Sequence, residues 1–354
     1  MMELMIAIAL SSIVIYGAVS MFMASRGTSQ TTSAVGNITD TGRVALDMMS
    51  ETVRSSGSMA CSAVNGQSPA YATGLNAGGT PLQLSYQFAL DGFEAVGSAP
   101  GNALALAAMP VAADGAANDW VGTAGSLDGL LIGKVIKNSD VVAMREAVPE
   151  SAPVYTVTPY SAGNTTINVN SVGDLQPGEY ATISSCTSST TFQIGAVNAA
   201  ANTITTNGPL TLNAGNLEQN FSTAALIAPV DMAVYYIGAG RDGDSSLFKY
   251  DEWTGKFQEL VPDVENMQVL YGVETSAGSG AISEYVTADK VPDFNSIANI
   301  KIALLVASPP GAVAVAQPAA APVYQVLGTT VTAPLDQRMR KVFETTIAVQ
   351  NAAL

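Results

Sequence analysis

The sequence has no histidine, and only 12% of its 354 residues are charged. Histidine is the commonest general base and the commonest metal ligand, so its absence argues against zinc sites and against Ser-His-Asp or Cys-His catalysis. Ser, Thr, Ala and Gly take the place of charge, which is typical of strands that face water with short polar side chains. We therefore expect a protein that is not an enzyme and that uses no cofactor, metal or small-molecule substrate.

Positive charge is also scarce. Lys and Arg together number 14 against 29 Asp and Glu, which gives a formal net charge of −15. A nucleic-acid partner requires a basic face to neutralise its phosphate groups, so we expect no nucleic-acid partner.

The chain opens on an uncharged run from Leu4 to Ala24. A helix needs about 20 apolar residues to cross a bilayer, so the run is long enough for a membrane anchor. It is longer than the apolar core of a signal peptide, which spans about 7–15 residues, and no basic stretch precedes it. Glu3 stands at its start, where an unpaired carboxylate in lipid costs on the order of a few kcal/mol. Two interpretations stay open: Glu3 has a partner, or it lies at the level of the headgroups.

Helical periodicity resumes after a polar stretch and continues to about residue 54. Apolar residues recur on one face, and charged residues recur on another at the spacing of a solvated ladder of ion pairs. Residues 55–57 then end the helix. We predict one long helix over residues 1–55, loosened near Gly27 and Gly36, with an apolar first half and an amphipathic second half. The apolar face carries Leu46, Met49 and Val53, and the charged face carries Arg43, Asp47, Glu51 and Arg54.

Beyond residue 56 the periodicity changes to two, which predicts strands. Turn residues separate the strands and no internal repeat is visible, so we expect residues 56–354 to form one β-rich, mainly antiparallel head domain. Residues 95–130 and 309–322 are predicted to be loops. The predicted strands cover residues 82–88, 141–145, 154–158, 165–169, 179–184, 191–195, 232–238, 246–252, 267–273, 299–307 and 342–349, and residues 267–273 place Met267, Val269, Tyr271 and Val273 on one side.

Three motifs have both a functional and a simpler structural interpretation. GAGRDG (238–243) matches the dinucleotide pattern G-x-G-x-x-G, but a strand-like segment follows it where a helix would have to hold the phosphates. We therefore predict a hairpin turn. Asp242 and Asp244 lack the remaining ligands of an EF-hand loop and are expected to serve that turn. Asp263 and Glu265 flank a strand, and alternation predicts that both face solvent and do not form a catalytic pair.

The two cysteines are Cys61 and Cys186. Behind a membrane anchor they are expected to face an oxidising compartment, where two cysteines most simply form one disulfide. Such a bond would close a loop of about 125 residues, which chain-entropy arguments value at roughly 4–5 kcal/mol. The alternative is two unrelated buried thiols. Redox catalysis is not expected, because the sequence contains no Cys-x-x-Cys.

The opening segment ELMIAIALSSIVIYGAVSMFMAS resembles the N-terminus of type IV pilins and type II secretion pseudopilins, which place a glutamate near the start of an apolar helix. The blocks that follow resemble the PilW family of minor pilins, in the family's order and over nearly the whole chain. ELVPDVENMQVLYGV (259–273) and RMRKVFETTIAVQN (338–351) are the most specific of these blocks. The others are GRVALDMMSETVRSSG with Cys61 shortly after it, NSDVVAMREA (138–147), GEYATISSCTSSTTFQIG (178–195) and VYYIGAG…SLFKYDE.

The resemblance implies an α+β, type IV pilin-like fold in which residues 1–25 cross the membrane first and join the filament core afterwards. It implies that Glu3 pairs with the N-terminal ammonium of a neighbouring subunit, an ion pair that forms only on correct assembly and so fixes the register of the helices. Family members carry a short basic leader that ends in Gly, whereas only Met1 and Met2 precede Glu3 here. Processing by a prepilin peptidase is therefore an expectation.

The function implied by the resemblance is that of a minor pilin that primes type IV pilus assembly and is incorporated at or near the tip. Its partners would be other minor and major pilins, contacted through the N-terminal helix. Its locations would be the bacterial inner membrane, with the head in the periplasm, and the extracellular pilus. Two alternatives stay open: a minor pseudopilin of a type II secretion system, or an anchored adhesin whose loops at 95–130 and 309–322 contact surfaces.

Overall fold

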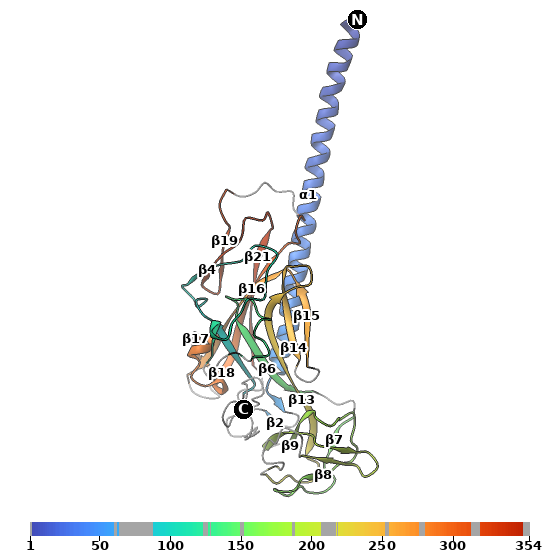
Figure 1. The fold of residues 1–354 in the computed structure, drawn as a ribbon, viewed down its shortest axis with the longest axis vertical. Coiled ribbons are helices and arrows are strands. Elements are labelled where there is room, and N and C mark those ends of the chain that lie inside the picture. Colours follow the sequence, from blue (N-terminus) through green and yellow to red (C-terminus); the bar gives the residue numbers. More distant parts are fainter. Residues whose placement is uncertain are drawn as a thin grey trace.

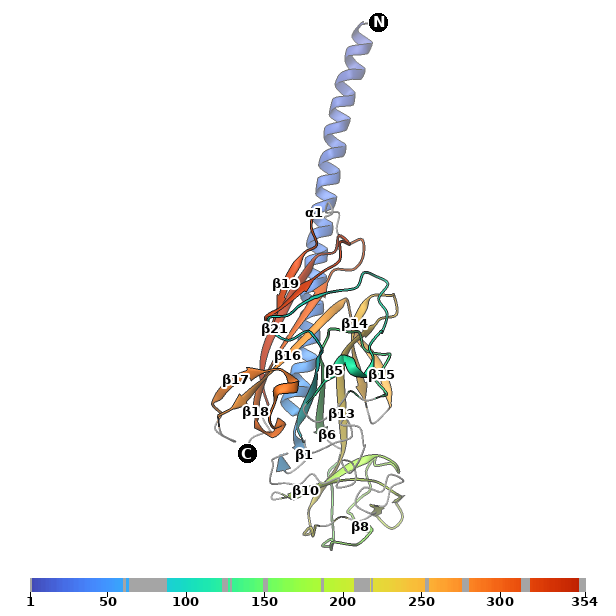
Figure 2. The same cartoon turned by 60° about the vertical axis from the view of Figure 1, so that its left-hand side comes forward.

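The chain forms a long helical rod joined to an elongated head, with the N-terminus at the free end of the rod (Figure 1). A second view confirms that the outer half of the rod stands clear of the head (Figure 2). The structure is a computed structural model that describes residues 2–59, 62–63, 88–122, 127, 129–148, 152–185, 188–206, 217, 219–251, 255–275, 280–312 and 319–349.

Helix α1 (Met2–Ser55) is a single helix of 54 residues, about 80 Å long at 1.5 Å per residue. It confirms the predicted long helix. The predicted loosening is wrong, because α1 continues without a break through Gly27 and Gly36. A glycine inside a helix costs only about 1 kcal/mol, too little to interrupt a helix whose second half is held by packing. Gly57 ends it in the left-handed conformation, with a φ of 79°.

The second half of α1 packs on the head through a stripe of apolar residues spaced about one or two turns apart. Ala45, Met49 and Val53 are fully buried in the stripe, and Ala34 and Ile38 extend it toward the rod. The stripe faces strands β18 (Ile297–Ala307) and β21 (Arg340–Ala348) of a four-stranded sheet. A hydrogen bond of 2.9 Å between the hydroxyls of Thr52 and Tyr235 also joins the helix to a second, larger sheet, which contains Tyr235.

The four-stranded sheet has the order β17-β16-β18-β21 and is antiparallel throughout. One face packs on α1 and the main core, and the other is covered by a small sheet of order β19-β20-β4. The predicted inward side of β16 is confirmed, because its four apolar residues all lie in the main core. The strands are β16 (Val264–Glu274), β17 (Ile282–Val286), β18 (Ile297–Ala307) and β21 (Arg340–Ala348), with β4 (Ala103–Ala105), β19 (Val323–Val326) and β20 (Thr329–Thr332) in the small sheet.

The larger sheet is organised around β13 (Leu226–Ala239), a strand of 14 residues that is buried on both faces. Its first residues pair with β7 and β9, its middle with β6 and its end with β14. One face contributes to the main core, and the other packs on a second core around Trp120. The other strands are β3 (Leu90–Ala95), β5 (Trp120–Val121), β6 (Val141–Ala147), β7 (Val154–Tyr155), β9 (Tyr180–Ser185), β10 (Ser188–Gln193), β14 (Ser245–Asp251) and β15 (Lys256–Pro262).

A distal lobe lies at the end of the head opposite the N-terminus, around β7, β8 and β9 (Figures 1 and 2). It comprises the described part of residues 152–225 and has its own core, which includes Tyr160, Phe192 and Phe221. The start of β13 joins it to the head. Its remaining strands are β8 (Thr166–Asn168), β11 (Val197–Asn198) and β12 (Thr203–Thr205), and the short pair β1 (Ser58–Met59) and β2 (Ser62–Ala63) follows α1.

The two main sheets meet at a seam, which we define as residues 138–140 and the facing stretch of β16. The backbone N–H of Asp140 donates to Met267 O at 2.9 Å. The Asp140 carboxylate accepts from the backbone N–H of Ala95 on β3 at 3.0 Å and from that of Val269 on β16 at 2.8 Å. One carboxylate therefore holds a strand of each sheet. The carbonyl oxygen of Asn138 adds bonds from the side-chain amides of Asn266 and Gln268.

The predicted class, a long helix followed by a mainly antiparallel β-rich head, is confirmed. Ten predicted segments overlap β6–β10, β13, β14, β16, β18 and β21, and one pair of strands, β4 and β20, is parallel among the described residues. The predicted loop at 95–130 is wrong in part, because it contains two short strands. β4 pairs with β20, and β5 pairs with β3. The described parts of 309–322 hold no strand. Residues 82–87, from another predicted strand, lie outside the described residues.

Gly42 of α1 packs tightly against β21. A Cβ at this position would overlap the ring of Phe343 on β21. We expect Gly42→Ala to force the helix or the ring to move, and to destabilise the full chain by about 1–3 kcal/mol. Thermal unfolding in detergent measures the effect.

Gly36→Ala is the matched control, because nothing lies within 4 Å of its Cβ position. It should stabilise the helix by up to about 1 kcal/mol. Equal unfolding temperatures for the two variants would contradict the packing described here.

Candidate assembly surface

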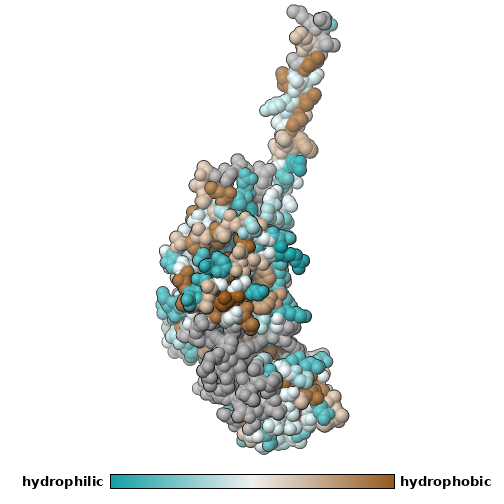
Figure 3. Space-filling view, in the orientation of Figure 1, coloured by the Kyte–Doolittle hydropathy of each residue, from teal (hydrophilic) through white to brown (hydrophobic). Residues whose placement is uncertain are grey.

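The outer half of α1 is apolar on every side and uncovered by the chain. The described large apolar side chains of this half are exposed, from Met5 at 73% to Met23 at 69%, and they give the rod its hydrophobic surface in Figure 3. By length and composition α1 is the one helix in the described part of the chain that could cross a membrane, and its most apolar stretch is not buried. A helix that is hydrophobic all round belongs in a bilayer or in contact with other helices.

Glu3 lies in the first turn of α1 and is exposed. The N-terminal end of a helix dipole favours a carboxylate at this position. Within the described part of the chain, no ion pair under 4 Å involves Glu3. Its partner in an assembly, implied by the resemblance, stays a prediction.

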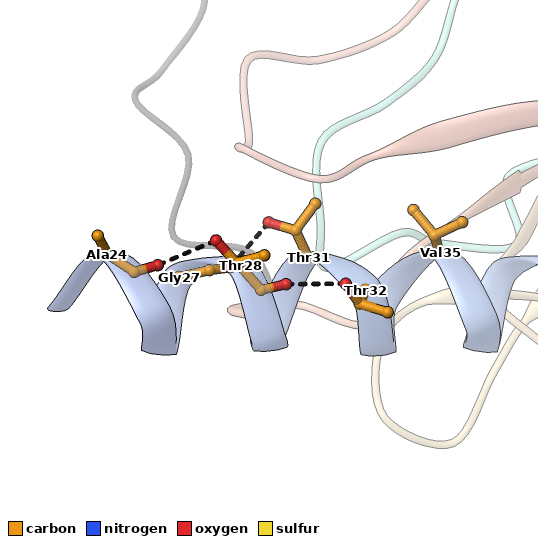
Figure 4. A pocket seen from close by; sticks show the side chains of 6 residues that line it. All are labelled: Ala24, Gly27, Thr28, Thr31, Thr32 and Val35. Atoms are coloured by element: carbon orange, nitrogen blue, oxygen red, sulfur yellow. Dashed lines mark hydrogen bonds between the residues drawn. The ribbon is translucent and has the colours of Figure 1, made fainter. Parts of the chain in front are cut away.

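A shallow hollow runs along α1 where the helix leaves the head (Figure 4). Three threonine hydroxyls near it donate to the backbone four residues earlier: Thr28 to Ala24 O at 3.1 Å, Thr31 to Gly27 O and Thr32 to Thr28 O, both at 3.0 Å. The hydroxyls are thus satisfied within the helix, and this polar stretch can enter an apolar environment at low cost. Ala24, Gly27 and Val35 complete the lining of the hollow.

The outward face of the second half of α1 carries charge and two apolar residues. Val44 and Met48 are 45% and 41% exposed there, beside charged residues. The predicted ladder of ion pairs is wrong for Arg43 and Asp47, which are exposed but not joined within 4 Å in the described structure. Exposed pairs gain little energy and lose side-chain entropy, so spacing alone does not fix them.

The prediction that Asp263 and Glu265 face solvent is also wrong. Both are buried in an ion-pair cluster, where Arg338 contacts both carboxylates. The guanidinium of Arg340 pairs with Glu265 at 2.6 Å and with Asp336 at 2.5 Å. A β-bulge in β16 between Val264 and Asn266 explains the error, because an extra residue breaks the alternation. Burial raises the pKa of Asp263 to about 6, against the opposing effect of Arg338.

The hairpin prediction for GAGRDG is confirmed, since β13 and β14 pair up to Ala239 and Ser245 and the rest of the motif lies in the turn between them. Gly243 has a φ of 80°, a conformation that favours glycine. Asp244 is buried and accepts from the backbone N–H of Asp263 at 3.2 Å, so its role is structural. No group of three or more His, Cys, Asp or Glu in the described residues is arranged to hold a metal.

Several features of the head bear on the other predicted sites. Cys61 and Cys186 lie outside the described residues, so their pairing stays a prediction.

The distal lobe was not predicted as a separate unit, because short strands joined by turns have similar sequences wherever they pack. The residues of the seam belong to the blocks NSDVVAMREA and ELVPDVENMQVLYGV. In the structure these two blocks are joined by hydrogen bonds.

Comparisons with known proteins bear on the second half of the head. Residues 234–351 match the family model of Type IV Pilus-assembly protein W, PilW. The match begins within β13, ends after β21, and confirms the resemblance of the blocks at 259–273 and 338–351.

Curated proteins gave no match. A solved structure, a type IV-like pilin from Thermus thermophilus, aligns at 18% identity over 35% of this chain and 67% of that chain, with a TM-score of 0.19. We draw no conclusion about this chain from that alignment.

The exposed apolar half of α1 predicts a sharp difference between two valine substitutions. Val14→Lys places a charge in the outer half, where Val14 is 70% exposed. A lysine at the centre of a membrane helix costs about 2.5–3.5 kcal/mol, so we expect much less of the protein in the alkali-resistant membrane fraction. Val44→Lys, on the outward face beside the head, is the matched control and should leave that fraction unchanged. Equal losses for both variants would contradict the division of α1 into two halves.

Proposed function

We propose that this chain, whose residues 234–351 match the PilW family model, is a minor pilin that primes the assembly of type IV pili and enters the pilus at or near its tip. The observation that carries the proposal is the unbroken helix α1, which is bound to the head along one half and uncovered along the other. A structural role in the pilus fits this arrangement. The composition without histidine supports a protein that is not an enzyme.

The mechanism follows from the solvation of α1. Before assembly, the bilayer covers the apolar outer half, and the head would lie on the periplasmic side of the inner membrane. When the helix leaves the membrane, its apolar surface needs a new cover, which the helices of other minor and major pilins would supply. Because α1 is continuous, the position of the outer half among those helices also sets the position of the head. A prepilin peptidase would prepare the N-terminus.

Glu3 would provide the register of that packing. A carboxylate among apolar helices is costly unless it is paired, so a wrong stagger of subunits is penalised and the correct one is not. The exposed position of Glu3 in the first turn leaves it accessible to a neighbour's ammonium group.

The test of the priming role is a deletion of the gene with complementation. We expect few or no surface pili in the deletion strain by electron microscopy, restored pili on complementation, and the protein at low copy number in sheared pili. Normal pilus numbers in the deletion strain would contradict the priming role. If protein secretion were lost while pili stayed normal, the type II pseudopilin interpretation would replace it.

Glu3→Gln tests the register role separately. Loss of one partner of a buried ion pair costs about 3–5 kcal/mol, so we expect pilus numbers to fall by more than about tenfold while the protein still reaches the membrane. Glu51→Gln removes an exposed carboxylate from the head-bound half of the same helix and serves as the control. Wild-type piliation with Glu3→Gln would remove the register role from Glu3 and leave the rest of the proposal standing.

A second role, binding at the outer end of the protein, is favoured by the distal lobe. The lobe lies at the end opposite the membrane-facing N-terminus and outside the family match (Figure 1). Replacement of residues 152–225 by a short linker should then leave piliation intact and reduce attachment to surfaces. Loss of both would show that the lobe serves assembly or folding.

A further inference from the structure

Glu94 on β3 lies beside the seam and is 4% exposed. The hydroxyl of Ser98 is 3.3 Å from Glu94 Oε1 and 3.4 Å from Asp140 Oδ1. It is also 2.8 Å from the carbonyl oxygen of Ala95. Three acceptor oxygens therefore surround one hydroxyl that has a single proton to donate. A second proton is required for a satisfied arrangement, and Glu94 in its protonated form would donate it to Ser98 Oγ.

The surroundings of this cluster hold little positive charge. Asp91, on the same strand as Glu94, pairs with Arg145 at 3.0 Å, and both side chains are fully buried. The short helix η4 (Ala288–Lys290) packs on β3 and contributes exposed Asp289 and Lys290. Lys290 acts on Glu94 more weakly than the two aspartates Asp140 and Asp289.

Tyr271 on β16 points its hydroxyl toward the same region. Its Oη is buried and has no hydrogen-bond partner among the described residues. It lies over the backbone of Gly92 on β3, where a Cβ would collide with it. The hydroxyl is close enough for Asp91, Glu94 and Asp140 all to act on its ionisation, and burial raises the pKa of Tyr271 well above its usual value. The interior of the seam is thus acidic and buried.

We propose that one proton, held on Glu94 and shared through Ser98 with Asp140, locks the two sheets of the head together, and that its loss in alkaline medium loosens the seam. The Asp140 carboxylate bonds to a strand of each sheet. A negative charge on Glu94 would repel this carboxylate and leave Ser98 unable to satisfy both. The head would then respond to external pH at the contact between its two sheets.

The direction of the pH effect follows from the titration of both groups. Burial, reinforced by Asp140 and Asp289, raises the pKa of Glu94 to about 9, and burial raises the pKa of Asp140 to about 7. The folded-state pKa of Glu94 lies above its unfolded value, so the protonated form contributes stability that is fully present in acid. That contribution is lost as the pH rises through about 9.

The experiment measures the unfolding temperature of the full chain in detergent between about pH 6 and pH 9, the range set by the two raised values. We expect the wild type to lose stability across this range, and Glu94→Gln, which mimics the protonated carboxyl, to lose less than half as much. Glu51→Gln, at an exposed position on the head-bound half of α1, should follow the wild type. A Glu94→Gln profile with the wild-type slope would overturn the proposal.

Two measurements keep the proposal testable if Glu94→Gln does not fold. The infrared band of a protonated carboxyl should be present in the folded wild type at pH 7, and its absence would refute the shared proton. Hydrogen exchange should show the amides of Ala95 and Val269 losing about tenfold protection between pH 6 and pH 9, after correction for intrinsic rates, while Ile302 in the centre of β18 keeps its protection. Unchanged protection at the seam would refute the loosening.

Discussion

A helix that is apolar on every side cannot remain in water, and the outer half of α1 is of this kind. The rest of the structure depends on this constraint. The inner half of the same helix is buried along one stripe by the head, so the uncovered half cannot fold back without breaking that packing. The exposed half therefore needs a cover from outside the chain, and in the proposed function lipid supplies it first and other helices supply it afterwards.

The head provides the rigidity that this arrangement needs. The contact of Gly42 with Phe343 places α1 directly on β21, and the bond from Thr52 to Tyr235 ties it to the larger sheet. The seam joins that sheet to β16 through the carboxylate of Asp140. The helix is thus connected to both sheets and, through β13, to the distal lobe. The cluster around Arg338 and Arg340 holds the start of β16 against the start of β21 in the same way.

Much of the fold could be predicted from sequence because the periodicity of apolar residues reports burial on one face. The length of α1 and the inward side of β16 are examples. Prediction failed where burial is not periodic. All six residues of β3 are buried, including Asp91 and Glu94, so no alternation marks the strand. The bulge at Glu265 reversed the expected side of a carboxylate. The arginine partners of Asp263 and Glu265 lie more than 70 residues further along the chain.

The candidate assembly surface, too, could be predicted from the sequence only in part. The apolar outer half of α1 could be predicted from composition alone, because a long uncharged helix is visible in the local sequence. The hollow beside Thr28 and Thr31 was not predicted. The blocks that carried the family resemblance contain the seam and the start of β21. Their specificity therefore reflects contacts that hold the head together.

The most direct test of the central claim is methionine oxidation footprinting of native protein in membranes and in sheared pili. Met5, Met21 and Met23 lie on the outer half of α1 and are 69–77% exposed in the single chain, whereas Met48 on the outward face beside the head is 41% exposed and Met49 is buried. The account predicts that the three outer methionines are protected in both fractions, like Met49, while Met48 reacts in at least the membrane fraction. Outer methionines that react as readily as Met48 in sheared pili would contradict it.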